Sequence, residues 1–189
     1  MDGYGPLGVM VGIGNLRSSV SLSHLVVLAA LAKLLPLKRV LEFGSGEWST
    51  SFFLNKDVFP NLEYLESYET SKDWYDHVFA QVISDPRVNL LYVNKPNLNA
   101  ASIDLSTFDL CLIDSDGATR GAVINTLVAR CPDNLLIVIH DYENPNHKIT
   151  VENVQPFVIT QVAGPQTALV WRGDRINRDE LTVLISTIK

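Results

Sequence analysis

The sequence predicts an α/β fold in which helices cover both faces of a doubly wound, mostly parallel sheet. Short aliphatic runs alternate with stretches whose apolar residues recur at helical spacing, the pattern of βαβ units. Five runs are expected to be parallel strands: residues 39–43, 62–68, 88–93, 108–113 and 135–139. Two further runs, 157–162 and 168–171, are separated by only five residues. Because that length cannot hold a crossover helix, these two strands should be antiparallel neighbours.

Helices are expected before the first strand and in most connections. The first helix has Ser21 or Ser23 as its cap and ends before Pro36. Its apolar face consists of residues at helical spacing, namely Leu22, Leu25, Val26, Ala29 and Ala32. Asn177, three residues before Glu180, has the spacing of a capping box and begins the final helix.

The chain of 189 residues has the length of one domain. Five of its eleven glycines fall within the first 14 residues. Residues 1–20 are therefore expected to form a flexible arm, and residues 21–189 a single domain.

Charge, cysteine content and hydropathy limit the partners and the location. Fifteen Lys and Arg against 21 Asp and Glu give a net charge of −6, which argues against a nucleic-acid partner. Cys111 and Cys131 have no zinc-site spacing and fit a reducing compartment. The apolar runs are far shorter than the ~20 residues of a membrane span, and the start of the chain lacks the basic residues of a signal peptide. We therefore expect a cytoplasmic protein with no membrane partner.

The strongest functional signal is in residues 40–50, where a strand leads into a glycine turn and then a helix. Gly44 and Gly46 let the backbone approach a ligand and direct free amides at it. A dinucleotide fingerprint has Gly or Ala where this chain has Ser49, and rarely has an acid at the position of Glu42. An acid there suits a cationic ligand, such as the sulfonium and amino group of S-adenosylmethionine (SAM).

Glu69, just past the second strand, is placed to accept both ribose hydroxyls, as either cofactor class requires. A purely structural interpretation exists for both acids. Glu42 would then be a solvated residue at a strand end, and Glu69 a helix-start carboxylate favoured by the dipole. Both positions fit the place where ligands bind in α/β sheets, which favours the binding interpretation.

A second polar group follows the fourth and fifth strands. Asp114 and the His140-Asp141 pair are expected at one rim of the cleft, provided that the two strands are neighbours. One interpretation makes His140 or Asp141 a general base for a substrate hydroxyl. Another makes Asp114, Asp141 and Asn144 ligands of Mg²⁺, and a third gives these residues only capping and hydrogen-bonding roles. Arg120 pairs with Asp114, with Asp116 or with an acidic substrate, or is solvated.

Together these segments resemble class I SAM-dependent methyltransferases, most closely the small single-domain members of the O-methyltransferase-like type. The motifs that carry the resemblance are residues 41–46 with 49–50, 67–70, 112–114 and 139–142, and it covers roughly residues 20–172. The resemblance implies a seven-stranded sheet of order 3-2-1-4-5-7-6 with strand seven antiparallel, which agrees with the hairpin inferred from the spacing.

The resemblance also implies roles for individual residues. The implied cofactor-binding set is Glu42, Gly44, Ser45, Gly46, Ser49, Glu69, Asn94 and Asp114. Within it, the glycines line the methionine part of SAM above Glu42, Glu69 holds the ribose, and Asn94 lies near the adenine. Asp114 faces the transferred methyl and forms the candidate catalytic set with His140 and Asp141. Trp48 stands where the family often has a third glycine, so it either packs over the cofactor or belongs to the core.

The sequence thus predicts a SAM-dependent methyltransferase with a small-molecule acceptor. The alternatives are an NAD-dependent oxidoreductase and a catalytically silent SAM-binding domain. A divalent cation is the less favoured addition, and no metal ligand is assigned. A homodimer, in which the glycine-rich arm crosses to a partner, is predicted to complete the acceptor pocket.

Overall fold

The computed structural model describes residues 23–160, 162 and 164–188, so the predicted arm over residues 1–20 lies outside the described residues. Its strands are β1 (Arg39–Phe43), β2 (Tyr64–Glu69), β3 (Val88–Tyr92), β4 (Leu110–Ile113), β5 (Leu136–Ile139), β6 (Phe157–Ile159) and β7 (Thr167–Val170). Its helices are α1 (Ser23–Leu34), α2 (Ser49–Leu54), α3 (Lys72–Val82), α4 (Pro96–Ser102), α5 (Gly117–Ala129) and α6 (Arg178–Thr187), with short 3₁₀ turns η3 (Leu105–Thr107) and η4 (Pro145–His147).

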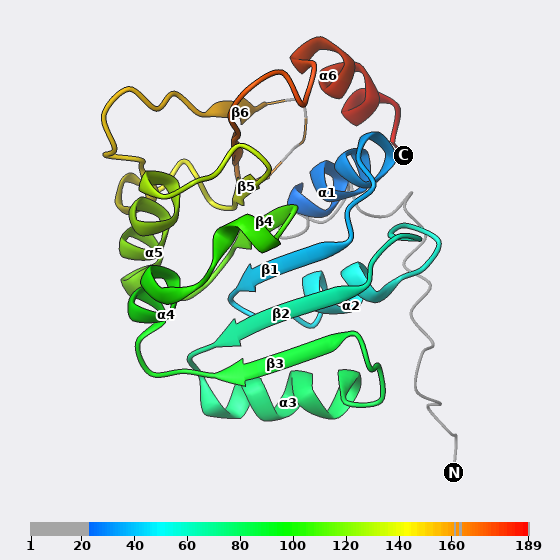
Figure 1. Cartoon of the computed structure of the whole chain (residues 1–189), viewed down its shortest axis with the longest axis vertical. Coiled ribbons are helices and arrows are strands. Elements are labelled where there is room, and N and C mark those ends of the chain that lie inside the picture. Colours follow the sequence, from blue (N-terminus) through cyan, green and yellow to red (C-terminus); the bar gives the residue numbers. More distant parts are fainter. Residues whose placement is uncertain (1–22, 161, 163, 189) are drawn as a thin grey trace.

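The strands form one seven-stranded sheet of order β3-β2-β1-β4-β5-β7-β6 (Figure 1). Strands β1 to β5 pair in parallel, and β7 runs antiparallel to both β5 and β6. The predicted fold class, strand order and terminal hairpin are therefore confirmed.

Alternation along the strands divides the core into two layers, one on each face of the sheet. Leu110 and Leu112 of β4 pack into the cluster that contains α1, α2 and α6. Cys111 and Ile113 of the same strand face the other way, into the cluster that contains α4 and α5. Helices α4 and α5 lie together at the left of Figure 1, and α1 and α6 lie together at its upper right. The sheet is thus the middle of three layers.

Helix α1 differs from its prediction in two ways. Residues 25–31 are each at most 1 % exposed, so the helix is buried on every side and not along one face. Ser23 belongs to the helix, and its hydroxyl donates to the carbonyl of Pro165 at 2.8 Å, so it does not cap the helix. Ser21 and Leu22 lie outside the described residues. The cap of α6 is as predicted, because the Asn177 side chain accepts from two backbone amides of the first turn.

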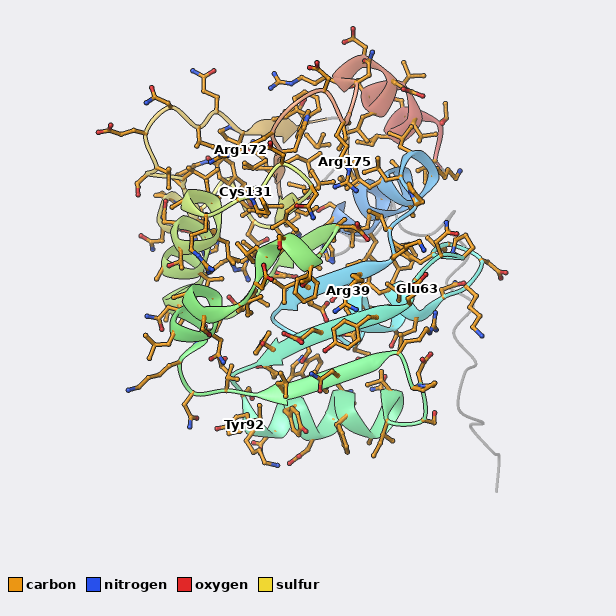
Figure 2. All side chains as sticks on the ribbon, viewed as in Figure 1. Arg39, Glu63, Tyr92, Cys131, Arg172 and Arg175 are labelled. Atoms are coloured by element: carbon orange, nitrogen blue, oxygen red, sulfur yellow. The ribbon has the colours of Figure 1, made fainter. Side chains whose placement is uncertain are left out.

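The parallel strands place their carboxyl ends at one edge of the sheet, marked by the arrowheads at the left of Figure 1. Figure 2 gives the same orientation, with Arg39 and Glu63 near the starts of β1 and β2 and Tyr92 at the end of β3. Two of the connections that leave this edge contain little helix: α4 has seven residues, and residues 140–156 between β5 and β6 contain only the three-residue turn η4. In the part of the chain that the structure describes, no helix has the length and apolar character to cross a membrane.

Candidate functional site

The turn between β1 and α2 closes tightly against the end of β4. Gly44 has a φ of +91°, and a Cβ at this position would lie 2.4 Å from the carbonyl oxygen of Asp114. A Cβ at Gly46 would lie 2.5 Å from the hydroxyl of Ser49. Glycine is the residue that fits both the left-handed backbone and the close approach. The predicted glycine turn is thus formed at the carboxyl edge of the sheet.

Glu42 lies beneath this turn, fully buried. Its carboxylate accepts hydrogen bonds from the hydroxyls of Ser49 (2.6 Å), Thr50 (2.7 Å) and Ser67 (2.6 Å). Burial raises the pKa of Glu42 to about 7, although the three hydrogen bonds act in the opposite direction. The solvated interpretation of Glu42 is wrong. The carboxylate ties β1 to α2 and β2, and it holds Ser49 below the turn.

Glu69 contacts both the backbone that leads into α3 and the glycine turn. One carboxylate oxygen accepts from the amides of Thr70 and Ser71, each at 2.7 Å. The other accepts from the hydroxyl of Ser45 at 3.2 Å. The carbonyl of Ser45 in turn accepts from the indole N–H of Trp74 at 2.7 Å. Glu69 therefore lies just ahead of α3, whose N-cap is Ser71, and it also contacts the glycine turn.

Trp48 and Asn94, two further candidates near the predicted cofactor site, are exposed. Trp48 is 45 % exposed, so the interpretation of Trp48 as a core residue is wrong. Asn94 is exposed in the loop between β3 and α4, and it lines an open hollow of about 450 Å³ together with Val93, Lys95, Leu98, Asn99 and Ser102. The amide of Val93 donates to the carbonyl of Glu69 at 2.8 Å, so this hollow begins beside Glu69.

Four charged or ionisable side chains meet where β4 and β5 end. Arg120, buried in the first turn of α5, lies 2.9 Å from Asp114 through Nη2 and 2.9 Å from Asp141 through Nη1. The same Asp114 oxygen is 3.1 Å from Nδ1 of His140. Asp141 has a left-handed backbone with a φ of +53°. The structure thus brings Asp114, His140 and Asp141 together as predicted, and Arg120 joins both acids.

The surroundings of Asp114 keep its side chain ionised. Burial alone would raise the pKa of this carboxyl, but the hydrogen bond from His140 and the charges of His140, His24 and Arg120 outweigh burial and lower it below its ordinary value. The carboxylate is consequently an acceptor and not a proton donor near neutral pH.

His24 joins this group without any spacing in the sequence that predicts it. Its ring lies 4.2 Å from that of His140, centroid to centroid, and its side chain is buried in the first turn of α1. Neither of its ring nitrogens has a hydrogen-bond partner within the described ranges. Burial lowers the pKa of His24 to about 4, and the charge of His140 acts in the same direction. In the sequence, His24 is noticeable only as a histidine directly before a run of apolar residues.

Asn144 and Asp116, which the sequence also suggested for this rim, do not join the cluster of Asp114, His140, Asp141 and Arg120. The side-chain oxygen of Asn144 accepts from the amide of Asn146 at the start of η4. Asp116 is exposed at the start of α5. The oxygen-ligand set of Asp114, Asp141 and Asn144 thus has one member engaged elsewhere.

Comparison with solved structures identifies the fold. No protein-family model and no curated protein matches this sequence. The structure of cofactor-bound Rv0187 from MTB has a TM-score of 0.62 at 19 % identity, covering 85 % of this chain and 84 % of that chain. An O-methyltransferase from Bacillus cereus in complex with SAH has a TM-score of 0.61 at 14 % identity, covering 84 % and 86 %.

The fold is therefore that of small class I O-methyltransferases. A spermidine synthase from Thermotoga maritima is also similar, with a TM-score of 0.56 at 12 % identity, covering 88 % of this chain and 62 % of that chain. Because proteins with this fold carry different functions, the assignment of an activity depends on the residues at the carboxyl edge.

Proposed function

We propose that this protein is a SAM-dependent methyltransferase acting on a small-molecule acceptor. The observation that carries the proposal is the arrangement of the carboxyl edge, where the turn at Gly44 closes against β4 and the carboxylate of Glu69 faces that turn. This edge is where open α/β sheets bind their ligands. The structural likeness to SAH-bound methyltransferases supports the same choice of cofactor.

Each part of the cofactor has a matching group on the chain. The backbone of residues 44–46 offers close approach to the methionine part, and Glu69 offers carboxylate oxygens to the ribose hydroxyls. The hollow beside Glu69, lined by Asn94, has room for the adenine. Glu42 and Ser49 support the turn from below, since their side chains already bond to each other. Their proposed role is to hold the loop and not to touch the ligand.

The second side of the edge is proposed to hold the acceptor. Bound SAM supplies an activated methyl group, so alignment of the acceptor provides much of the rate. The side chains of Asp114 and Asp141 are 23 % and 35 % exposed, whereas that of His140 is 6 % exposed. An acceptor hydroxyl would therefore meet the two carboxylates first. His140, whose Nδ1 lies 3.1 Å from Oδ1 of Asp114, is the group proposed to take up the proton.

Calorimetric titration of the whole protein with S-adenosylhomocysteine tests the cofactor assignment. We expect the wild type to bind, and Glu69→Gln to bind roughly 10- to 100-fold more weakly, since a hydrogen bond to a charged group contributes ~1.5–3 kcal/mol. Glu63→Gln is the matched control, because Glu63 pairs with Lys38 on the surface. Absence of binding by the wild type would refute the proposal.

Transfer of a labelled methyl group to a panel of hydroxyl acceptors tests the activity itself. Transfer supports the proposal. Tight binding of S-adenosylhomocysteine with no transfer to any acceptor would instead assign a silent SAM-binding domain, and binding of NADH in its place would assign an oxidoreductase.

A further inference from the structure

We propose that His24, His140 and Asp114 form a binding site for one divalent transition-metal ion, represented by zinc. One ring nitrogen of each histidine and one carboxylate oxygen of Asp114 all lie within 4.8 Å of one another. The three side chains come from distant parts of the chain: the first turn of α1, the end of β5 and the end of β4. The fold therefore assembles a donor set that no local motif contains.

The state of His24 is the independent observation that points to a ligand. Its side chain is 3 % exposed, and both ring nitrogens are without a hydrogen-bond partner among residues 23–160, 162 and 164–188. Leaving a buried polar group unsatisfied costs its full desolvation penalty, so such groups are rare in folded proteins. A metal ion at the donor set would satisfy one of these nitrogens, whereas a histidine kept only for packing leaves the cost without compensation.

The charge around the donor set also favours a cation. Asp114 and Asp141 bring two negative charges, and Arg120, which contacts both, brings one positive charge. With neutral histidines the group has one excess negative charge. Arg120 also orients the carboxylate of Asp114, which is the role that outer-shell partners have around protein metal sites.

The donor types select the class of metal. Two imidazole nitrogens and one carboxylate oxygen match the ligands of zinc and of other late first-row ions, which leave one or more positions open for water or substrate. Mg²⁺ and Ca²⁺ prefer sets made of oxygens alone. The proposed site therefore shares only Asp114 with the oxygen set of Asp114, Asp141 and Asn144, which was one of three interpretations of the sequence, and it selects a different class of metal.

This proposal does not depend on methyl transfer, although it shares His140 and Asp114 with the proposed acceptor side. Metal binding is measured on the protein without SAM. The failure of one proposal therefore leaves the other standing.

The first test is calorimetric titration of the chelator-treated full chain with zinc chloride. We expect one ion per chain, with binding weakened at least ~100-fold in His24→Gln and in His140→Gln, since even loss of an outer-shell partner costs 10- to 100-fold. His77→Gln is the control, because His77 is exposed and bonds to Gln81. Mg²⁺ should not compete. Absence of zinc binding, or equal binding by wild type and a folded His24→Gln variant, would overturn the proposal.

A second measurement needs no variant and therefore does not depend on whether the variants fold. X-ray absorption of the zinc-loaded wild type should show two imidazoles and at least one oxygen around the metal. A shell of oxygens only, of sulfur, or with a single imidazole would overturn the site.

Discussion

The two halves of the carboxyl edge are built in different ways. On the side of β1 and β2, the buried carboxylate of Glu42 is surrounded by three neutral hydroxyls, all within the first βα turn and the neighbouring strand. On the side of β4 and β5, two acids, an arginine and two histidines come from four separate elements. We call the first the hydroxyl side and the second the ionic side.

The difference separates a scaffold from a reactive site. The hydroxyl side satisfies Glu42 and Glu69 with neutral donors, which hold the loop in place. The ionic side holds charges of both signs next to His24, whose ring nitrogens have no hydrogen-bond partner in the described part of the chain. Perturbed and incompletely satisfied ionisable groups of this kind cluster at functional sites.

The largest expected effect comes from breaking the ionic side at Arg120. Arg120→Met removes the group that joins Asp114 and Asp141 and leaves two partly buried carboxylates without their cation. We expect the free energy of unfolding to fall by ~3–5 kcal/mol in chemical denaturation. Lys38→Met, which removes an exposed ion pair with Glu63, should change it little. Equal losses in the two variants would contradict the described ionic side.

The next largest effect on stability is expected at Gly44, in the turn that lies between the hydroxyl side and the ionic side. Gly44→Ala adds backbone strain at a φ of +91° and a clash with the carbonyl of Asp114, so a loss of about 3 kcal/mol or more is expected. Gly173→Ala is the matched control, since Gly173 has a φ of +67° and a Cβ added there would meet no atom within 4 Å. Its loss should be ~1–2 kcal/mol, from strain alone. Thermal unfolding of both variants checks the comparison, and a greater loss in Gly173→Ala would contradict it.

The smallest expected effects are on how the free energy of unfolding depends on pH. They have opposite signs on the hydroxyl side and the ionic side. The pKa of Glu42 is raised from 4.5 to about 7, so its contribution to stability decreases as pH rises through that window. The pKa of His24 is lowered from 6.5 to about 4, so its contribution is present above pH 6.5 and is lost as pH falls toward 4.

Substitutions of Glu42 and of His24 should therefore change the slope of the free energy of unfolding against pH in opposite directions. Relative to wild type, Glu42→Gln should gain stability as pH rises from 4.5 to 7, and His24→Gln should gain it as pH falls from 6.5 to 4. The upper limit of each change is on the order of 3 kcal/mol. Denaturation across pH in metal-free buffer measures both, with His77→Gln as a control. Slopes of the same sign would refute the contrast between the sides.

The sequence predicted the hydroxyl side better than the ionic side for a physical reason. Glu42 contacts Ser49 and Thr50 across the first βα turn, and Glu69 accepts from the amides of the two residues that follow it. Such contacts follow from local spacing. The strand order came from the resemblance, and the hairpin came from loop length.

The ionic side depends on contacts that spacing does not encode. Arg120 reaches Asp141 because β4 and β5 are neighbours, and His24 reaches His140 because α1 lies over that end of the sheet. Helical periodicity likewise predicted only one buried face for α1, whereas the helix is buried on every side. The spacing of apolar residues does not show how many other elements pack around a helix.

SAM is proposed to bind at this edge, between the hydroxyl side and the ionic side. A crystal structure of the protein with S-adenosylhomocysteine bound tests it most directly. We expect the ribose hydroxyls to contact the carboxylate of Glu69, the adenine to lie in the hollow beside Asn94, and the sulfur to face Asp114. A ligand bound away from the turn at Gly44, or with its ribose away from Glu69, would contradict it.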